Sequence, residues 1–78
     1  MTLYELEIAA VVGEWTLIKT GDDVKPNSDR LFVNCWCGDT QIDYVCLGIV
    51  NDQKVIIGFI ETFGEDGYHE IPFCYKKV

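Results

Sequence analysis

Four strand-like segments joined by short turns make up most of this chain and limit its fold more than any other feature. Each segment is rich in β-branched and aromatic residues, and they cover residues 30–37, 40–50, 54–63 and 68–77. Turns of two to four residues separate them. Such short turns join antiparallel neighbours, because a parallel pair needs a crossover of about a dozen residues or more. The pattern predicts a single, mainly β domain over residues 1–78, built on an antiparallel meander of these four strands.

Two other features refine this prediction. Residues 20–29, TGDDVKPNSD, gather Gly, Asp, Pro, Asn and Ser, which are turn-forming residues, so we expect a loop there. Pro72 lies inside the last predicted strand and has no backbone N–H to donate. The last strand should therefore lie at an edge of the sheet or carry a bulge at Pro72.

The N-terminal segment fits two structures. Thr2 and Glu5 match a capping box, and Gly13 could end a helix over residues 3–12 that covers the sheet. The same segment also has the two-residue period of a strand, because apolar residues recur at Tyr4, Leu6, Ile8, Ala10 and Val12. This alternation favours a strand that forms an N-terminal hairpin with residues 14–20, and the single covering helix is the alternative.

The two middle strands are apolar on both faces. In residues 40–50, Ile42, Tyr44 and Cys46 alternate with Val45, Leu47 and Ile49, and in residues 54–60, Val55, Ile57 and Phe59 alternate with Ile56 and Ile60. A strand of this kind is normally covered on both sides, yet 78 residues leave little material for two layers. Either the N-terminal segment covers one face, or a partner or a second subunit of a homodimer does.

The four cysteines are expected to be core residues. On a strand, Cys35 and Cys37 point to the same side as Leu31 and Val33, and free cysteine behaves as a small hydrophobe. A zinc site would have to combine these two with Cys46, Cys74 or His69, but structural zinc sites use pairs spaced C-x2-C to C-x4-C, whereas this pair is C-x-C. No C-x-x-C redox pair is present either. We therefore predict no metal site and no cofactor.

No motif indicates an enzyme. His69 is the only histidine, and nothing near it in the sequence marks a nucleophile or a paired acid. The adjacent carboxylates Asp22-Asp23 and Glu65-Asp66 lie in glycine-containing loops and do not fit calcium-loop spacing. A glycine-rich phosphate loop and a G-x-S-x-G motif are also absent. The sequence predicts no catalytic residues.

Negative charge is the feature that points to a partner. The formal net charge is −7, and residues 39–70 contain seven Asp and Glu against one Lys. This charge disfavours direct binding to nucleic acid and favours docking on a basic protein surface. The candidate acidic contacts are Asp39, Asp43, Asp52, Glu61, Glu65 and Asp66. The candidate aromatic anchors are Trp15, Trp36, Tyr44 and Tyr68.

The N-terminal residues MTLYELEIAA carry acids where a signal peptide has basic residues, and no apolar run approaches the length of a membrane span. We expect a cytoplasmic protein that does not bind membranes. Thiols are kept reduced in that compartment, so disulfides are not expected.

Trp15, Pro26, residues 31–33, a strand hairpin and the closing segment YHEIPF (residues 68–73) occur in an order that resembles a small phage- and prophage-borne domain of unknown function. The resemblance covers residues 15–73, with Glu70 where that domain has a tryptophan. It implies a mobile-element origin. In size and charge the chain is also similar to phage-encoded inhibitors of host enzymes, CRISPR–Cas inhibitors among them.

These observations predict a small acidic protein-binding domain. The most specific form of the hypothesis is an inhibitor that docks on the basic nucleic-acid-binding surface of a host enzyme or CRISPR–Cas complex. The alternatives are a small cysteine-based zinc-binding module and a homo-oligomeric structural protein.

Overall fold

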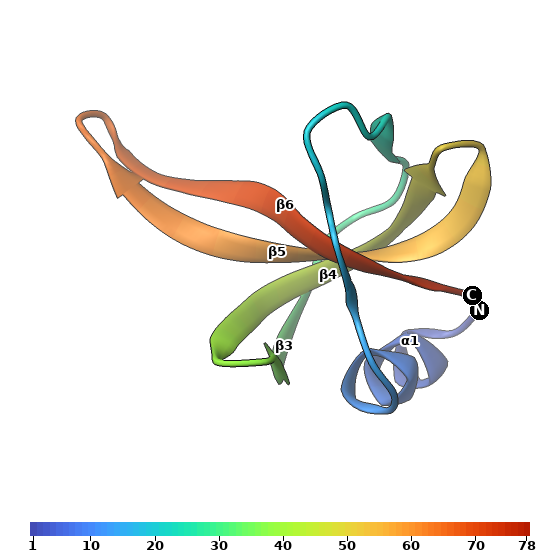
Figure 1. The fold of residues 1–78 in the computed structure, drawn as a ribbon. Helices are drawn as coiled ribbons and strands as arrows, with labels where there is room; N and C mark the ends of the chain where they lie inside the picture. Colours follow the sequence, from blue (N-terminus) through green and yellow to red (C-terminus); the bar gives the residue numbers. More distant parts are fainter.

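A computed structural model describes residues 1–78, and it contains one helix and six strands. In chain order these are α1 (Leu3–Val11), β1 (Thr16–Leu17), β2 (Val24–Pro26), β3 (Leu31–Cys37), β4 (Thr40–Val50), β5 (Gln53–Gly64) and β6 (Gly67–Lys77). The strands form one antiparallel sheet in the order β1-β6-β5-β4-β2, and β3 also pairs with β4 (Figure 1). The predicted fold class and the meander of β3 to β6 are confirmed.

Strands β2 and β3 lie along β4 in succession. β2 pairs with residues 48–50 of β4, and β3 pairs with residues 40–45. Between them, the Asn27 N–H donates to the Leu47 carbonyl oxygen (3.0 Å), and the Leu47 N–H donates to Ser28 Oγ (2.8 Å). The prediction of a loop over residues 20–29 was therefore incomplete. The long strand β4 offers backbone partners along this whole edge, so Val24–Pro26 becomes a short strand.

Local backbone chemistry sets the turns and the bulge. Asn51 and Asp52 both have positive φ (50° and 67°), as a two-residue hairpin turn of the I′ type requires. Gly58 pairs with Cys74 but Phe59 pairs with Pro72, so Phe73 is an extra residue in β6. Of the two alternatives predicted for Pro72, an edge position or a bulge, the structure has the bulge, at the residue that follows Pro72.

The N-terminal segment is a helix, so the favoured strand hairpin of residues 3–12 with residues 14–20 was wrong. Both bonds of the capping box are present: the Glu5 N–H donates to Thr2 Oγ1, and the Thr2 N–H donates to Glu5 Oε1, each at 3.1 Å. Leu6 and Ala10, four residues apart, are buried against the sheet. The apolar alternation was misleading, because α1 is apolar on its outer side too, where Tyr4, Ile8 and Val11 are exposed.

The C-terminal end of α1 is held by a side chain from the other end of the chain. Lys76 Nζ donates to the carbonyl oxygens of Ala9 (3.0 Å), Ala10 (2.9 Å) and Val12 (2.7 Å). The same ammonium lies 4.4 Å from the centre of the Trp15 ring. Burial lowers the pKa of Lys76. A helix of nine residues is marginal alone, so this contact and the burial of Leu6 and Ala10 explain why it forms.

Each face of the sheet has its own core. The first face packs against α1, and its core consists of Leu6, Ala10, Val33, Cys35, Ile42, Val45, Ile56 and Cys74. The second face has a core of Cys46, Val50, Val55, Ile57 and Phe59, with Val24, Tyr44 and Tyr75 packed against it. Of the two covers considered for the apolar faces, the N-terminal segment is the one observed, on the first face.

Ile42 lies on the first face and not, as expected, on the side of Tyr44 and Cys46. The β3–β4 pairing shifts between Phe32, which pairs with Tyr44, and Cys35, which pairs with Ile42. This irregularity breaks the two-residue period within β4. The prediction that Cys35 and Cys37 share a side with Val33 is confirmed, since Val33 and Cys35 belong to the first-face core and half-buried Cys37 packs against it.

The β5–β6 hairpin extends beyond the rest of the sheet. β4 pairs with β5 only as far as Tyr44 and Phe59, whereas β5 and β6 continue to pair up to Gly64 and Gly67. We call residues 60–71 the arm. Figure 1 shows it projecting from the body of the molecule as a two-stranded ribbon.

Candidate functional site

The second face of the sheet continues onto the arm as a surface of aromatic and acidic side chains. Residues that pair directly in an antiparallel sheet point to the same face. The pairs Phe32–Tyr44, Tyr44–Phe59, Phe59–Pro72, Glu61–Glu70 and Phe63–Tyr68 therefore follow one another along this face. The name aromatic–acidic face is used below for Phe32, Asp43, Tyr44, Glu61, Phe63, Tyr68 and Glu70.

The rings of this face are unusually exposed. Phe32 is 66% exposed, Phe63 76% and Tyr68 73%. They form two edge-to-face pairs: Phe32 with Tyr44, with ring centres 5.7 Å apart, and Phe63 with Tyr68, 5.2 Å apart. Each pair spans two strands, so the rings are held in place and still present most of their surface to solvent.

Two carboxylates lie directly opposite each other in the middle of the face. Glu61 of β5 pairs with Glu70 of β6, and like charges in this position destabilise a sheet. Arg30 offsets one of them: its Nη1 lies 2.9 Å from Glu70 Oε2, and its guanidinium lies 4.4 Å from the centre of the Phe59 ring. Glu61 takes part in no ion pair. One negative charge at the centre of the face is therefore left without a cation.

Asp43 and Tyr44 surround the uncompensated Glu61. The Glu61 N–H donates to Asp43 Oδ2 (3.2 Å), which ties the base of the arm to β4. Desolvation, the Glu61 carboxylate and the Glu70 carboxylate raise the pKa of Tyr44. The phenol of Tyr44 therefore stays protonated at neutral pH and adds an aromatic ring, not a charge, beside Glu61.

Few of the other acids have a cationic partner. Lysine and arginine form two ion pairs, Lys25–Asp23 and Arg30–Glu70. At the tip of the arm, His69 Nε2 lies 2.6 Å from Asp66 Oδ1, while neighbouring Glu65 is unpaired. The arm thus carries a negative field from Glu61 to its tip.

The structure brings together only some of the predicted contact residues. Asp43, Tyr44, Glu61 and Tyr68 belong to the aromatic–acidic face, and Glu65 and Asp66 form the turn at the tip of the arm. The others lie elsewhere: Asp39 and Trp36 at the β3–β4 turn, Asp52 at the opposite end of β5, and Trp15 half-buried beside Lys76.

Sequence reasoning missed three members of the face. Phe32, Phe63 and Glu70 are brought into it by their cross-strand partners Tyr44, Tyr68 and Glu61. Pairing the last two predicted strands around residues 64–67 would have placed Phe63 opposite Tyr68. The position of Phe32 opposite Tyr44 depends on the shifted register between β3 and β4, and no pattern in the sequence predicts that shift.

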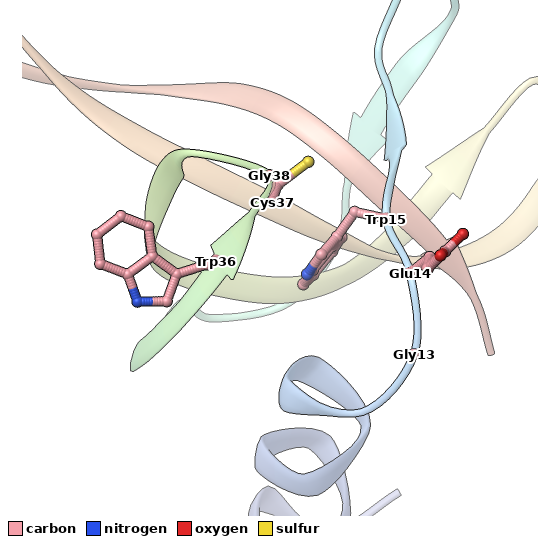
Figure 2. Close-up of a pocket in the computed structure, with 6 residues that line it drawn as sticks. All are labelled: Gly13, Glu14, Trp15, Trp36, Cys37 and Gly38. Atoms are coloured by element: carbon pink, nitrogen blue, oxygen red, sulfur yellow. The ribbon is translucent and has the colours of Figure 1, made fainter.

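A cavity of about 260 Å³ lies on the other side of the molecule, between the residues that follow α1 and the β3–β4 turn. Gly13, Glu14, Trp15, Trp36, Cys37 and Gly38 line it (Figure 2). Figure 2 shows the Trp36 ring and the Glu14 carboxylate pointing away from Trp15 on opposite sides. Glu14 is the only residue of the lining that carries a charge at neutral pH.

The four cysteines are free thiols. Cys35, Cys46 and Cys74 are buried, and this burial raises their pKa values. A thiol of this kind stays protonated at neutral pH and is a poor nucleophile or metal ligand. No group of three or more His, Cys, Asp or Glu side chains is placed to hold a metal ion.

No helix of the structure has the length and apolar character needed to span a membrane.

Comparisons with protein-family models, with curated proteins and with solved structures give no match to this chain.

Proposed function

We propose that this chain is a protein-binding domain that docks its aromatic–acidic face on a basic, nucleic-acid-binding surface of an enzyme and thereby inhibits it. One observation carries the proposal. The exposed rings of Phe32, Phe63 and Tyr68 flank three carboxylates, and only one of these, Glu70, forms an ion pair with a cation of the chain. In size and charge the chain is similar to inhibitors encoded by mobile elements. Its partner would be a nucleic-acid-binding enzyme of the host, the class of protein that such inhibitors block.

The two kinds of side chain would have different roles in such an interface. Aromatic rings contribute a large buried area at a low cost in side-chain entropy, and they are common anchors at the centres of interfaces. Carboxylates take the place of phosphates, steering the domain to a basic surface and excluding neutral partners. Because the arm projects from the body, it can enter a groove that a flat face would not reach.

A capture experiment with matched variants tests the proposal. The tagged protein would be used at low salt on an extract of its source or host cell, beside a Glu61→Lys/Glu65→Lys variant of the arm. A Glu7→Lys/Glu14→Lys variant makes the same change of charge at exposed positions away from the arm and is the control. We expect the protein and the control to recover one nucleic-acid-binding enzyme, which high salt or added nucleic acid releases.

The arm variant should recover none of this enzyme. If the arm variant binds as well as the control, or if nucleic acid does not compete, then the aromatic–acidic face is not the docking surface and the proposal fails.

Self-association is a second candidate function, favoured by the outer side of α1. Tyr4, Ile8 and Val11 are exposed there, four and three residues apart, and form an apolar stripe with no partner in the chain. Sedimentation equilibrium distinguishes the two functions. A concentration-dependent dimer that Ile8→Lys abolishes would support self-association through α1, and a monomer at all concentrations would contradict it.

A further inference from the structure

We infer that the partner inserts an arginine side chain into the part of the aromatic–acidic face formed by Phe32, Tyr44 and Glu61. This inference rests on the proposed function, because it names the chemical group with which the partner would enter the face.

The chain itself shows how this face binds a guanidinium group. Arg30 lies 4.4 Å from the centre of the Phe59 ring and places Nη1 2.9 Å from Glu70 Oε2. The site thus consists of an aromatic ring on β5 and a carboxylate on β6. In the register of the sheet, Phe59 pairs with Pro72, and Glu70 lies two residues from Pro72 towards the arm.

The same arrangement occurs a second time, one strand further across the sheet. Tyr44 of β4 pairs with Phe59, and Glu61 lies two residues from Phe59 towards the arm. In the register of the sheet, Tyr44 therefore has the same position relative to Glu61 that Phe59 has relative to Glu70. In the first site the cation comes from the chain, whereas in the second Glu61 has no cationic partner.

The second site is open to a side chain from outside. Phe32 pairs with Tyr44 on its outer side and is 66% exposed, Tyr44 itself is half-buried, and Glu61 is exposed. Asp43 lies beside Glu61 and adds a second negative charge. A cation placed over Tyr44 would meet these carboxylates and would also relieve the repulsion between Glu61 and Glu70.

Arginine fits this site better than lysine. A guanidinium is planar, so it can stack on a ring and donate to a carboxylate at the same time, as Arg30 does. An ammonium is a compact, strongly hydrated charge that gains less from the ring. Arginine is also a frequent nucleic-acid-binding residue, so a surface that binds phosphates would present it.

Two capped peptides test the inference, one of six arginines and one of six lysines. We expect the arginine peptide to bind about tenfold more tightly in calorimetric titration, and the NMR signals of Phe32, Tyr44 and Glu61 to shift most. Glu61→Gln should remove most of the preference for arginine. Glu65→Gln, at the tip of the arm, removes the same charge outside the site and should weaken both peptides equally.

Three results would overturn the inference: equal affinity for the two peptides, no binding of either, or equal effects of the two variants. The result of the capture experiment does not depend on the result of the peptide titration. A captured basic enzyme together with equal peptide affinities would refute only the arginine site, whereas the absence of any such enzyme would refute the proposed function whatever the peptides do.

Discussion

The base and the arm of the β5–β6 hairpin belong to the same two strands, yet the base is buried and the arm is open to solvent. In the base, every residue from Val55 to Phe59 is buried, with the first-face core on one side and the second-face core on the other. In the arm, every residue is exposed or half-buried, and no third strand pairs with it. One hairpin thus supplies both the centre of the core and the most exposed aromatic rings.

This difference shows how a small domain can present a binding surface without losing its core. A two-stranded ribbon is marginal in water by itself. Here the base holds the arm in register, and the bond from the Glu61 N–H to Asp43 and the Phe63–Tyr68 pair support it locally. Residues of the base should therefore determine stability, and residues of the arm should determine binding. The predictions below test this division, from the largest expected effect to the smallest.

The first prediction compares two phenylalanines of β5. Phe59→Ala in the base should lower the free energy of unfolding by about 4 kcal/mol, because it opens a cavity in the second-face core and removes the ring under Arg30. Phe63→Ala in the arm should lower it by less than about 1 kcal/mol, since only one edge-to-face pair is lost. Urea unfolding followed by circular dichroism measures both. Equal losses would contradict the division between base and arm.

The second prediction concerns the neighbouring lysines at the end of the base. Lys76→Met should lower the free energy of unfolding by about 3 kcal/mol, because three carbonyl oxygens at the end of α1 lose a charged donor. Lys77→Met is the control, since Lys77 is exposed on the same strand. Hydrogen exchange should show faster exchange of the α1 amides in the Lys76 variant and no change in the amides of the arm. Unchanged α1 protection would mean that Lys76 does not hold the helix.

The third prediction is a loss of stability at alkaline pH that comes from the core and not from the arm. Burial raises the pKa values of Cys35, Cys46 and Cys74 above the ordinary thiol value of 9.0. Above pH 9 these thiols lose protons in the unfolded chain first, so the unfolded state binds fewer protons and stability falls as pH rises. The lowered pKa of Lys76 acts in the opposite direction, while the raised pKa of Tyr44 adds to the loss above pH 10.

The free energy of unfolding should fall between pH 9 and pH 10, by about 1 kcal/mol from Cys74 alone, the thiol whose pKa burial raises most. Urea unfolding in a reducing buffer across this range measures it. Cys46→Ala should make the loss smaller, and Glu65→Gln in the arm should leave it unchanged. A free energy of unfolding that does not depend on pH above 9 would show that the three thiols are not desolvated.

The smallest predicted effect has the opposite sign. Glu61→Gln removes the repulsion between two directly opposed carboxylates, so it should raise the free energy of unfolding by up to about 0.5 kcal/mol. The same variant is the one expected to lose the preference for arginine peptides. A variant that is more stable and binds less would show that Glu61 is present for binding. If Glu61→Gln lowers stability, the two carboxylates do not repel each other in the folded chain.

Short-range features of the sequence predicted much of the fold. The turns at Gly38-Asp39 and Asn51-Asp52 separate the strands as expected, because their residues favour the backbone conformations that tight turns need. The bulge beside Pro72 follows from the missing N–H. The capping box of Thr2 and Glu5 correctly indicated a helix, although the apolar alternation of the same residues favoured a strand.

The candidate site was only partly predictable. The sequence pointed to an acidic partner-binding surface, and it named Asp43, Tyr44, Glu61 and Tyr68. It could not separate them from Asp39 and Asp52, which have the same chemistry but lie at turns away from the arm. Glu70 and Arg30, forty residues apart in the sequence, form an ion pair that only the tertiary structure brings together.

The sequence by itself determined the four long strands of residues 30–77, their antiparallel succession and the excess of negative charge, because turns, periodicity and charge depend on residues close together in the chain. Only the tertiary structure decided the state of residues 3–12, the face on which Ile42 lies and the place where the rings meet the carboxylates. Each of these depends on partners distant in sequence: Lys76 for the end of α1, the shifted β3–β4 register for Ile42, and the end of the β4–β5 pairing at Phe59 for the arm.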